Sequence, residues 1–329
     1  MNRRNAAEDD ARGKAAENAW VDDTPANPAL DPQFIFGLAG LYGCAKNVSR
    51  KFDVLDLSCG TGRQLERLAS QSKGLLVGID SSREACLIAR QQLARAGGRA
   101  QIVCKDLSHV DARNLGTFDL LLHLALPSDA APALQPVLLD LIGRCMAPGA
   151  VALIGIAAGV GPAVSQIEAA LAPRGVEFLN TFPAAGFGAL ATSHERAHAA
   201  DAFVADTPGV HYAVFGKIGE ASSAPNARGP HLRWSTRLVH PPIGALYRAP
   251  ATWHDAPAQC SVVVPRAETQ AALDELAGGA KNFAQIVSGA RNRLTKAGVK
   301  PGAEISAVVA DDFLTLAWAG FVTPLWKEA

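Results

Sequence analysis

The segment from Phe52 to Gln64 constrains the fold of this chain most, because an apolar run ends in a carboxylate and then breaks into closely spaced glycines. It predicts a strand, a tight turn and then a helix. Gly60 and Gly62 lack a Cβ atom, so the turn can adopt strained dihedral angles and let a ligand approach the main chain. Asp56 and Ser58 would add polar contacts at the same place.

The glycine pattern argues against a dinucleotide site. Such a site needs G-x-G-x-x-G to hold a pyrophosphate, whereas here only Gly60-Thr61-Gly62 follows the acidic strand end. An acid in that place suits a cationic ligand rather than a phosphate.

More apolar runs follow, and the first three close on a polar residue. They cover residues 74–80, ending at Asp80, 101–106, ending at Asp106, and 117–123, ending at His123. A further strand is expected at 149–156 after a turn at 147–149, and two more at 176–180 and 211–218. Helical patterns lie between the runs, most clearly from Ser82 to Ala96. The alternation predicts an α/β fold with a doubly wound sheet, and residues 181–208, which lack a clear period, are expected to cover the active site.

Taken in order, these motifs resemble the class I S-adenosylmethionine-dependent methyltransferases over roughly residues 31–218. The resemblance implies a seven-stranded Rossmann-like sheet and S-adenosylmethionine as the cofactor. It assigns the methionine part to the loop backbone, the ribose to Asp80, and the adenine to Asp106 with Leu107. The full set assigned to the cofactor is Asp56, Ser58, Cys59, Gly60, Thr61, Gly62, Asp80, Ser81, Asp106, Leu107 and His123.

Each of these side chains has a simpler structural explanation. Asp80 and Asp106 have the alternative of capping a helix or closing a solvated turn, and Asp56 that of orienting its loop. His123 is the catalytic candidate, because class I enzymes commonly place acceptor-facing residues at the end of the fourth strand. Its alternative is a histidine that bonds to the backbone or shapes the cofactor pocket.

The expected chemistry depends on the cofactor more than on any side chain. A sulfonium methyl group is already activated, so transfer needs an acceptor lone pair held in line. An acceptor amine must also be neutral, through desolvation or a nearby base.

A narrower resemblance, to bacterial protein-lysine methyltransferases with a regulatory domain, appears at both ends of the chain. It is carried by residues 31–43, by 273–279 and by 313–322. It implies a small, winged-helix-like C-terminal accessory domain.

The resulting domain prediction has four parts: a flexible tail at 1–26, a methyltransferase domain at 27–218, a linker at 219–230 and the accessory domain at 231–329. We expect the accessory domain to govern the acceptor rather than the cofactor, and to be the surface through which a homodimer would form.

Composition excludes several other classes of protein. The 329 residues carry 31 basic and 31 acidic side chains, so no bulk charge draws the chain to nucleic acid or to a membrane. No apolar run reaches the roughly 18 residues of a membrane span. Six cysteines without C-x-x-C spacing indicate reduced thiols in a cytoplasmic protein, and His194, His198 and His211 show no metal-ligand spacing.

The sequence therefore predicts an enzyme that methylates a protein, peptide or small molecule, with no membrane partner and no nucleic-acid partner expected. The alternative is a catalytically inactive chain that binds the cofactor or serves as a scaffold subunit in a larger assembly.

Overall fold

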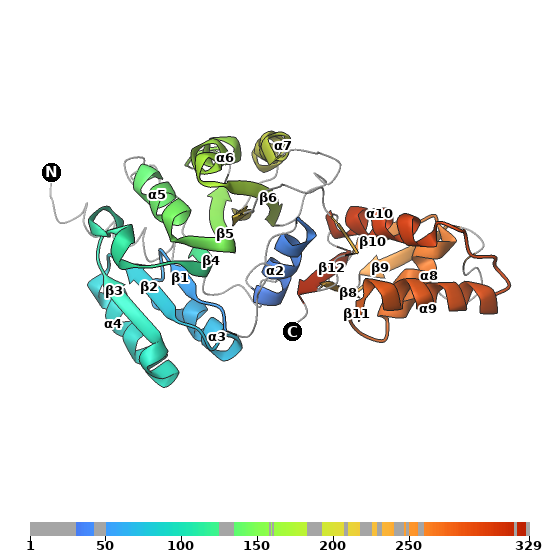
Figure 1. The fold of residues 1–329 in the computed structure, drawn as a ribbon, viewed down its shortest axis with the longest axis horizontal. Helices are drawn as coiled ribbons and strands as arrows, with labels where there is room; N and C mark the ends of the chain where they lie inside the picture. Colours follow the sequence, from blue (N-terminus) through green and yellow to red (C-terminus); the bar gives the residue numbers. More distant parts are fainter. Residues whose placement is uncertain are drawn as a thin grey trace.

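A computed structural model describes most of the chain (Figure 1). The described residues are 31–42, 51–124, 135–157, 159, 161–182, 193–206, 210–217, 226–228, 232–239, 247, 250–255, 260–318 and 321–326. The predicted tail at 1–26 lies outside this set, as does most of the predicted linker.

A seven-stranded sheet forms the centre of the larger part of the molecule. Its strands are β1 (Val54–Asp56), β2 (Leu76–Asp80), β3 (Ala100–Cys104), β4 (Phe118–His123), β5 (Met146–Ala157), β6 (Val176–Phe182) and β7 (Val210–Lys217). The order across the sheet is β3-β2-β1-β4-β5-β7-β6. β7 runs antiparallel to both of its neighbours, and the other pairs are parallel. All seven predicted strands are confirmed, and so is the doubly wound fold class.

Helices cover both faces of this sheet because the strand side chains alternate between two apolar cores. Val54, Leu120 and Leu153 face one core with helices α2 (Pro32–Leu41) and α3 (Arg63–Gln71), whereas Leu55 and Leu121 face the other. That second core holds α5 (Gln135–Cys145), α6 (Val164–Leu171) and α7 (Ser193–Asp206). α4 (Arg83–Gln92) lies against β2 and β3. Short 3-10 helices occupy Leu93–Arg99, Leu107–His109, Ala112–Asn114 and Ala172–Arg174.

One local prediction is wrong, and a second is not tested by the structure. The turn expected at 147–149 belongs to β5, which starts at Met146 opposite Phe118 and absorbs the extra residues through a shift in register. That the segment 181–208 covers the active site stays a prediction; the segment contains α7, which packs on β6 and buries Ala197 and Ala200. Its remaining residues, 183–192 and 207–208, lie outside the described part of the chain.

The C-terminal part is a smaller α/β unit. A three-stranded sheet has the order β11-β8-β12, and β9 pairs with β10 in a separate hairpin. The strands are β8 (Leu232–Thr236), β9 (Ala251–Asp255), β10 (Cys260–Val264), β11 (Lys281–Asn282) and β12 (Val322–Trp326), and the helices are α8 (Ala267–Leu276), α9 (Phe283–Lys296) and α10 (Ile305–Trp318). The unit combines a small antiparallel sheet with three helices, and the winged-helix-like fold expected for it stays a prediction.

Helix α2 connects the two parts. It starts at Pro32, and the side chain of Asp31 caps it by accepting a hydrogen bond from the Gln33 amide at 2.9 Å. It packs chiefly against β12 and more lightly against β7 and β8, so it lies between the large sheet and the C-terminal unit (Figure 1). The helix that the domain prediction assigned to the methyltransferase domain is therefore in closest contact with the last strand of the chain.

Candidate cofactor site

The predicted cofactor residues gather at the carboxyl ends of β1, β2 and β4. β1 lies between β2 and β4, where the connections of the sheet change direction, and open α/β sheets bind ligands at such a switch point. Asp56 pairs with Leu122 of β4, so His123 is one residue beyond it. Asp56 also pairs with Gly78 of β2, which places Asp80 two residues beyond it.

The loop after β1 is fastened to both neighbouring strands. The Leu57 amide donates a hydrogen bond to the Leu122 carbonyl at 2.8 Å, and the Cys59 amide donates to the Ile79 carbonyl at 3.0 Å. The Cys59 thiol points into the core, because a Cβ atom added at Gly78 would lie 2.8 Å from its Sγ. The main chain of the loop, and not the thiol, is thus available to a ligand.

Asp80 ties the loop to the start of α4. Its Oδ2 accepts a hydrogen bond from the Gly60 amide at 2.9 Å, and its Oδ1 accepts one from the Ser82 amide at 2.8 Å. The helix cap itself is Ser82, whose side chain accepts from the Ala85 amide. Asp80 therefore does more than cap a helix, and each carboxylate oxygen keeps a lone pair that a ribose hydroxyl can use.

Glycine suits the backbone conformation at both loop positions, and at position 62 it also allows close packing. Gly60 has a φ of +50° and Gly62 one of +83°. A Cβ atom at Gly62 would lie 2.9 Å from the Ala89 Cβ, so Gly62 permits close packing of the loop on α4. Thr61 between them is half-buried, and Ser81, after Asp80, is exposed.

Asp56 is a buried carboxyl group with one amide partner, since its Oδ1 accepts from the Ser58 amide at 3.1 Å. Burial, with the nearby Asp80 charge adding to it, raises the pKa of Asp56 from 3.8 to about 7, against the opposing effect of the Ser58 amide. A cationic ligand beside Asp56 would favour the ionised form.

The raised pKa of Asp56 predicts a specific pH dependence of stability. The folded chain binds one more proton than the unfolded chain between pH 3.8 and about 7, so this stabilising contribution is complete below pH 3.8 and is lost as the pH rises through 7. Asp56→Asn removes the contribution. The free energy of unfolding of the variant, measured by urea denaturation and compared with the wild type, should therefore rise by a few kcal/mol between pH 4 and pH 8.

Asp111→Asn provides a control of opposite sign. The Arg113 side chain lowers the pKa of Asp111 to about 2, so this variant should lose stability relative to the wild type as the pH rises above the acid range. Equal pH profiles for the wild type and Asp56→Asn would contradict the assigned state of Asp56.

Asp106 follows the end of β3, but its side chain hydrogen-bonds to a residue just after it in the sequence. Its Oδ1 accepts from the Ser108 amide at 2.8 Å and from the Ser108 hydroxyl at 2.6 Å, and these bonds lower the pKa of Asp106. It caps the short helix Leu107–His109, which is the structural alternative considered for it. Leu107 is partly buried against the second core.

His123 ends β4 with a buried imidazole. Desolvation lowers the pKa of His123 to about 4, so the ring is neutral at pH 7. Its Nδ1 atom is buried and has no hydrogen-bond partner among the described residues. An orphaned polar atom at the switch point is available to a ligand, but a base with this pKa holds a proton too weakly to deprotonate an ammonium group.

One buried polar cluster was missed by the sequence analysis. The Arg196 guanidinium of α7 lies 4.8 Å from the ring centroid of Tyr42, which follows α2, and its Nη2 donates to the Phe178 carbonyl at 2.9 Å. Burial raises the pKa of Tyr42, and the nearby Arg196 charge opposes that effect. Arg196 sits in an alanine-rich segment without a clear period, so no local signal marks it as buried.

The remaining observations concern metal ligands, membrane-spanning helices and cavities. Within the described part of the chain, no group of three His, Cys, Asp or Glu side chains is placed to hold a metal ion. The described helices include none of sufficient length and apolarity to cross a membrane. A cavity of about 360 Å³ lies between the end of β5, the start of α6 and α7, beyond the cofactor residues. A second, of about 670 Å³, lies on the C-terminal unit.

The comparisons with known proteins agree with this geometry. Residues 54–149 match the family model of a methyltransferase domain. No curated protein sequence matches the chain. The structure of PKMT2 from Rickettsia typhi is similar over 92% of this chain and 77% of that chain, at 12% identity and a TM-score of 0.70. The structure of PKMT2 in complex with AdoHcy covers the same shares at 12% identity and a TM-score of 0.68.

A third similar structure is a S-adenosylmethionine-dependent methyltransferase from Clostridium acetobutylicum ATCC 824, over 64% of this chain and 99% of that chain, at 13% identity and a TM-score of 0.45. At these identities the likeness to PKMT2 concerns the fold, and it extends through the C-terminal unit as well as the large sheet.

Proposed function

We propose that this chain, which has the class I methyltransferase fold and a methyltransferase domain at residues 54–149, uses S-adenosylmethionine to methylate a side chain of a protein acceptor. The observation that carries the proposal is the hydrogen bond from the Gly60 amide to Asp80, at the switch point of a sheet with the order β3-β2-β1-β4-β5-β7-β6. It joins the two elements to which the cofactor is assigned.

The residues present fit the cofactor. Asp80 offers acceptor oxygens for a ribose diol, and the loop offers main chain that glycine leaves uncovered at position 60. Asp56 offers a carboxyl group that a positive charge would ionise. The cofactor supplies the activated sulfonium methyl group.

In the proposed reaction, the role of the protein is to position the acceptor. His123 is neutral at pH 7, so we assign it to orienting the acceptor or lining the cofactor pocket through Nδ1 rather than to removing a proton. Desolvation beside the cofactor would lower the pKa of an acceptor amine, which would then release its proton to water and react in the neutral form. Holding the acceptor in line then supplies several kcal/mol of the barrier.

A protein acceptor is supported by two observations. The motifs near both chain ends resemble bacterial protein-lysine methyltransferases, and the two-part fold of PKMT2 extends over 92% of this chain. The C-terminal unit adds surface that a small acceptor does not need, and we assign it to acceptor selection.

Asp80→Ala should weaken S-adenosylmethionine binding about 10- to 150-fold, because the ribose loses a charged acceptor worth about 1.5 to 3 kcal/mol. The dissociation constant is measured by calorimetry, and folding is checked by thermal melting. Asp111→Ala is the matched control, since Asp111 Oδ1 likewise accepts from an amide two residues ahead, at 3.0 Å, outside the site. A wild-type dissociation constant for Asp80→Ala would restrict Asp80 to a structural role.

The proposed activity is tested with S-adenosylmethionine carrying a tritiated methyl group in a cell lysate, with Asp80→Ala as the blank. Label in the protein fraction above the blank supports a protein acceptor, and label confined to small molecules overturns it. Cofactor binding without transfer to any fraction would instead favour the inactive, scaffold alternative. Absence of cofactor binding, with NADH bound instead, would overturn the methyltransferase assignment.

A further inference from the structure

The larger cavity on the C-terminal unit is lined by basic and polar side chains that the cofactor site does not use. It measures about 670 Å³, and its lining includes Arg228, Phe283, Val287, Ser288, Arg291 and Ser306. Most of the lining comes from one face of α9, because residues four apart lie above one another on a helix. Ser306 comes from α10.

Arg228 forms the remaining wall of the cavity, and two hydrogen bonds hold the backbone before it in place. Arg228 follows Asn226, whose amide donates to the Leu41 carbonyl of α2 at 2.7 Å. The neighbouring Ala227 carbonyl accepts a hydrogen bond from Nε1 of the buried Trp234 at 3.1 Å. These two bonds hold the backbone that carries Arg228 over the start of α9.

Two arginines in the lining have no acidic partner. Arg228 and Arg291 are exposed and form no ion pair with any described residue. Arg293, on another face of α9, is bonded by contrast to Asp274 at 2.6 Å and to Glu275. No acidic side chain in the described part of the chain therefore neutralises the positive charge in the cavity.

The start of α9 adds to this positive potential. Asn282 caps the helix, and its side chain accepts from the Gln285 amide. Phe283 and Ala284 occupy the first two helical positions and line the cavity, and amides at these positions have no acceptor within the helix. The positive end of the helix dipole lies at the same place.

We infer that this cavity binds an acidic segment of the methyl acceptor. Two arginines, two amides and the hydroxyls of Ser288 and Ser306 offer donors for carboxylates, and Val287 with Ala284 offers apolar surface for a neighbouring aliphatic side chain. The inference is built on the proposed protein acceptor and names the chemistry of its docking segment.

An acidic peptide fits the site better than nucleic acid does. Proteins that bind nucleic acid neutralise many phosphates along a track. The cavity instead gathers two unpaired arginines in one place, and the whole chain has 31 basic and 31 acidic residues.

The test measures peptide binding without methyl transfer. A fluorescein-labelled hexapeptide of alternating glutamate and leucine is titrated with the full chain at 0.15 M salt, and binding is followed by fluorescence anisotropy. The double variant Arg228→Glu/Arg291→Glu should lose at least about tenfold in affinity, since two charge-assisted donors become repulsive carboxylates.

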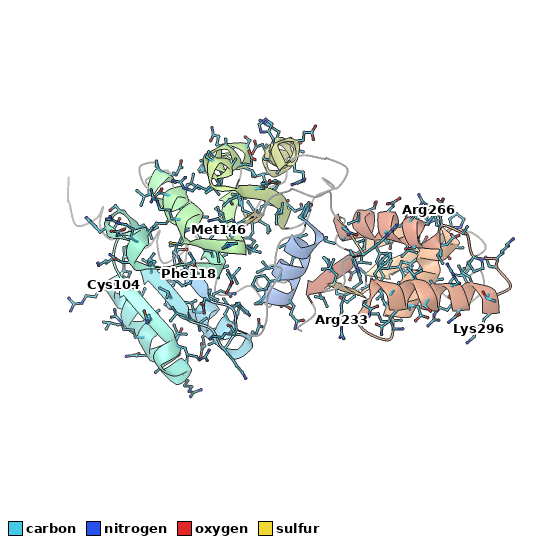
Figure 2. The ribbon with its side chains drawn as sticks, in the orientation of Figure 1. Cys104, Phe118, Met146, Arg233, Arg266 and Lys296 are labelled. Carbon is cyan, nitrogen blue, oxygen red and sulfur yellow. The ribbon has the colours of Figure 1, made fainter. Side chains whose placement is uncertain are left out.

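The matched control is Lys296→Glu/Lys300→Glu, which changes the net charge equally outside the cavity. Lys296 lies at the opposite end of α9 from Arg233, which pairs with Asn282 beside the cavity (Figure 2). Lys296 follows Arg291, the last α9 residue in the lining, by five positions, which advance about 7.5 Å along the helix and turn about 140° around it, so Lys296 lies on another face of α9. The control should bind the peptide within about twofold of the wild type.

Several results of these binding measurements would contradict the docking inference. Equal losses in both double variants would overturn the inference. So would tighter binding of a labelled hexapeptide of alternating lysine and leucine, or of a labelled oligouridylate, than of the glutamate–leucine peptide. Calorimetry with S-adenosylmethionine on the same samples separates the two claims. If the wild type binds the cofactor but not the peptide, only the docking site is contradicted. If the wild type does not bind the cofactor, the proposed function is contradicted.

Discussion

Gly60→Val should abolish detectable binding of S-adenosylmethionine while leaving the chain folded. Gly60 has a φ of +50°, a region in which a β-branched side chain is strongly disfavoured. Valine there would displace the backbone, break the bond from the residue 60 amide to Asp80, and cover main chain assigned to the cofactor. We expect a loss of more than about 100-fold in affinity, measured by calorimetry.

Gly116→Val separates cofactor binding from backbone strain. Gly116 has a φ of +84°, and an added Cβ atom would meet nothing within 4 Å. This variant should suffer a comparable strain in its turn and still bind S-adenosylmethionine normally. Normal binding by Gly60→Val would remove the loop from the cofactor site.

Gly37→Ala should destabilise the whole chain although alanine favours helices. A Cβ atom at Gly37 would lie 2.3 Å from the Pro324 carbonyl oxygen, 2.7 Å from its carbon and 2.9 Å from the Leu325 Cα. These are backbone atoms of β12, so they cannot turn away as a side chain would. The cost of forcing α2 from β12 should exceed the gain of about 1 kcal/mol in helix propensity, for a net loss of about 1 to 3 kcal/mol.

Gly278→Ala supplies the same change in atoms at an open position, since a Cβ atom there meets nothing within 4 Å. Thermal melting should place this control close to the wild type and Gly37→Ala several degrees lower. Equal melting temperatures would mean that α2 and β12 separate freely.

The α2–β12 contact also affects how the C-terminal unit is studied. One apolar core includes Ile35 and Phe36 of α2, Leu153 of the large sheet and Phe313 of α10. Deleting residues after 230 would expose the face of α2 that β12 covers, so loss of solubility would not reveal a role in acceptor selection. Substitutions in the cavity on α9 address that role without opening the core.

The large sheet was predictable because its strands carry local signals. Apolar runs ending in Asp56, Asp80 and His123 identify three parallel strands and place their ends together. α7 was not predictable in the same way, because its residues form no apolar stripe and Arg196 is buried among alanines. The closeness of Gly37 to Pro324 depends on residues at opposite ends of the sequence, and no local pattern encodes it.

The sequence groups the candidate cofactor residues but does not give their hydrogen-bond partners or their burial. The sequence locates Asp106 after β3, yet only the structure reveals that Ser108 occupies its Oδ1. His123 likewise gives no sign in the sequence that its ring is desolvated, because burial depends on strands and helices brought together by folding. Asp80 has an amide partner from the loop and one from the turn into α4, whereas the alternatives that the sequence offered for it were ribose binding, a helix cap or a solvated turn.

Because α2 packs on β12, this part of the fold cannot be completed until the last strand of the chain has been synthesised. The strands β1 to β7 and most of their covering helices have emerged from the ribosome long before Val322–Trp326 exists. Throughout that interval the apolar residues of α2, including Phe34 and Ile35, which are buried in the finished protein, lack the strand that covers them. Contacts between such distant residues form slowly, and exposed apolar surface invites aggregation. A nascent chain stalled before β12 should thus be a chaperone client, even though its sheet is complete.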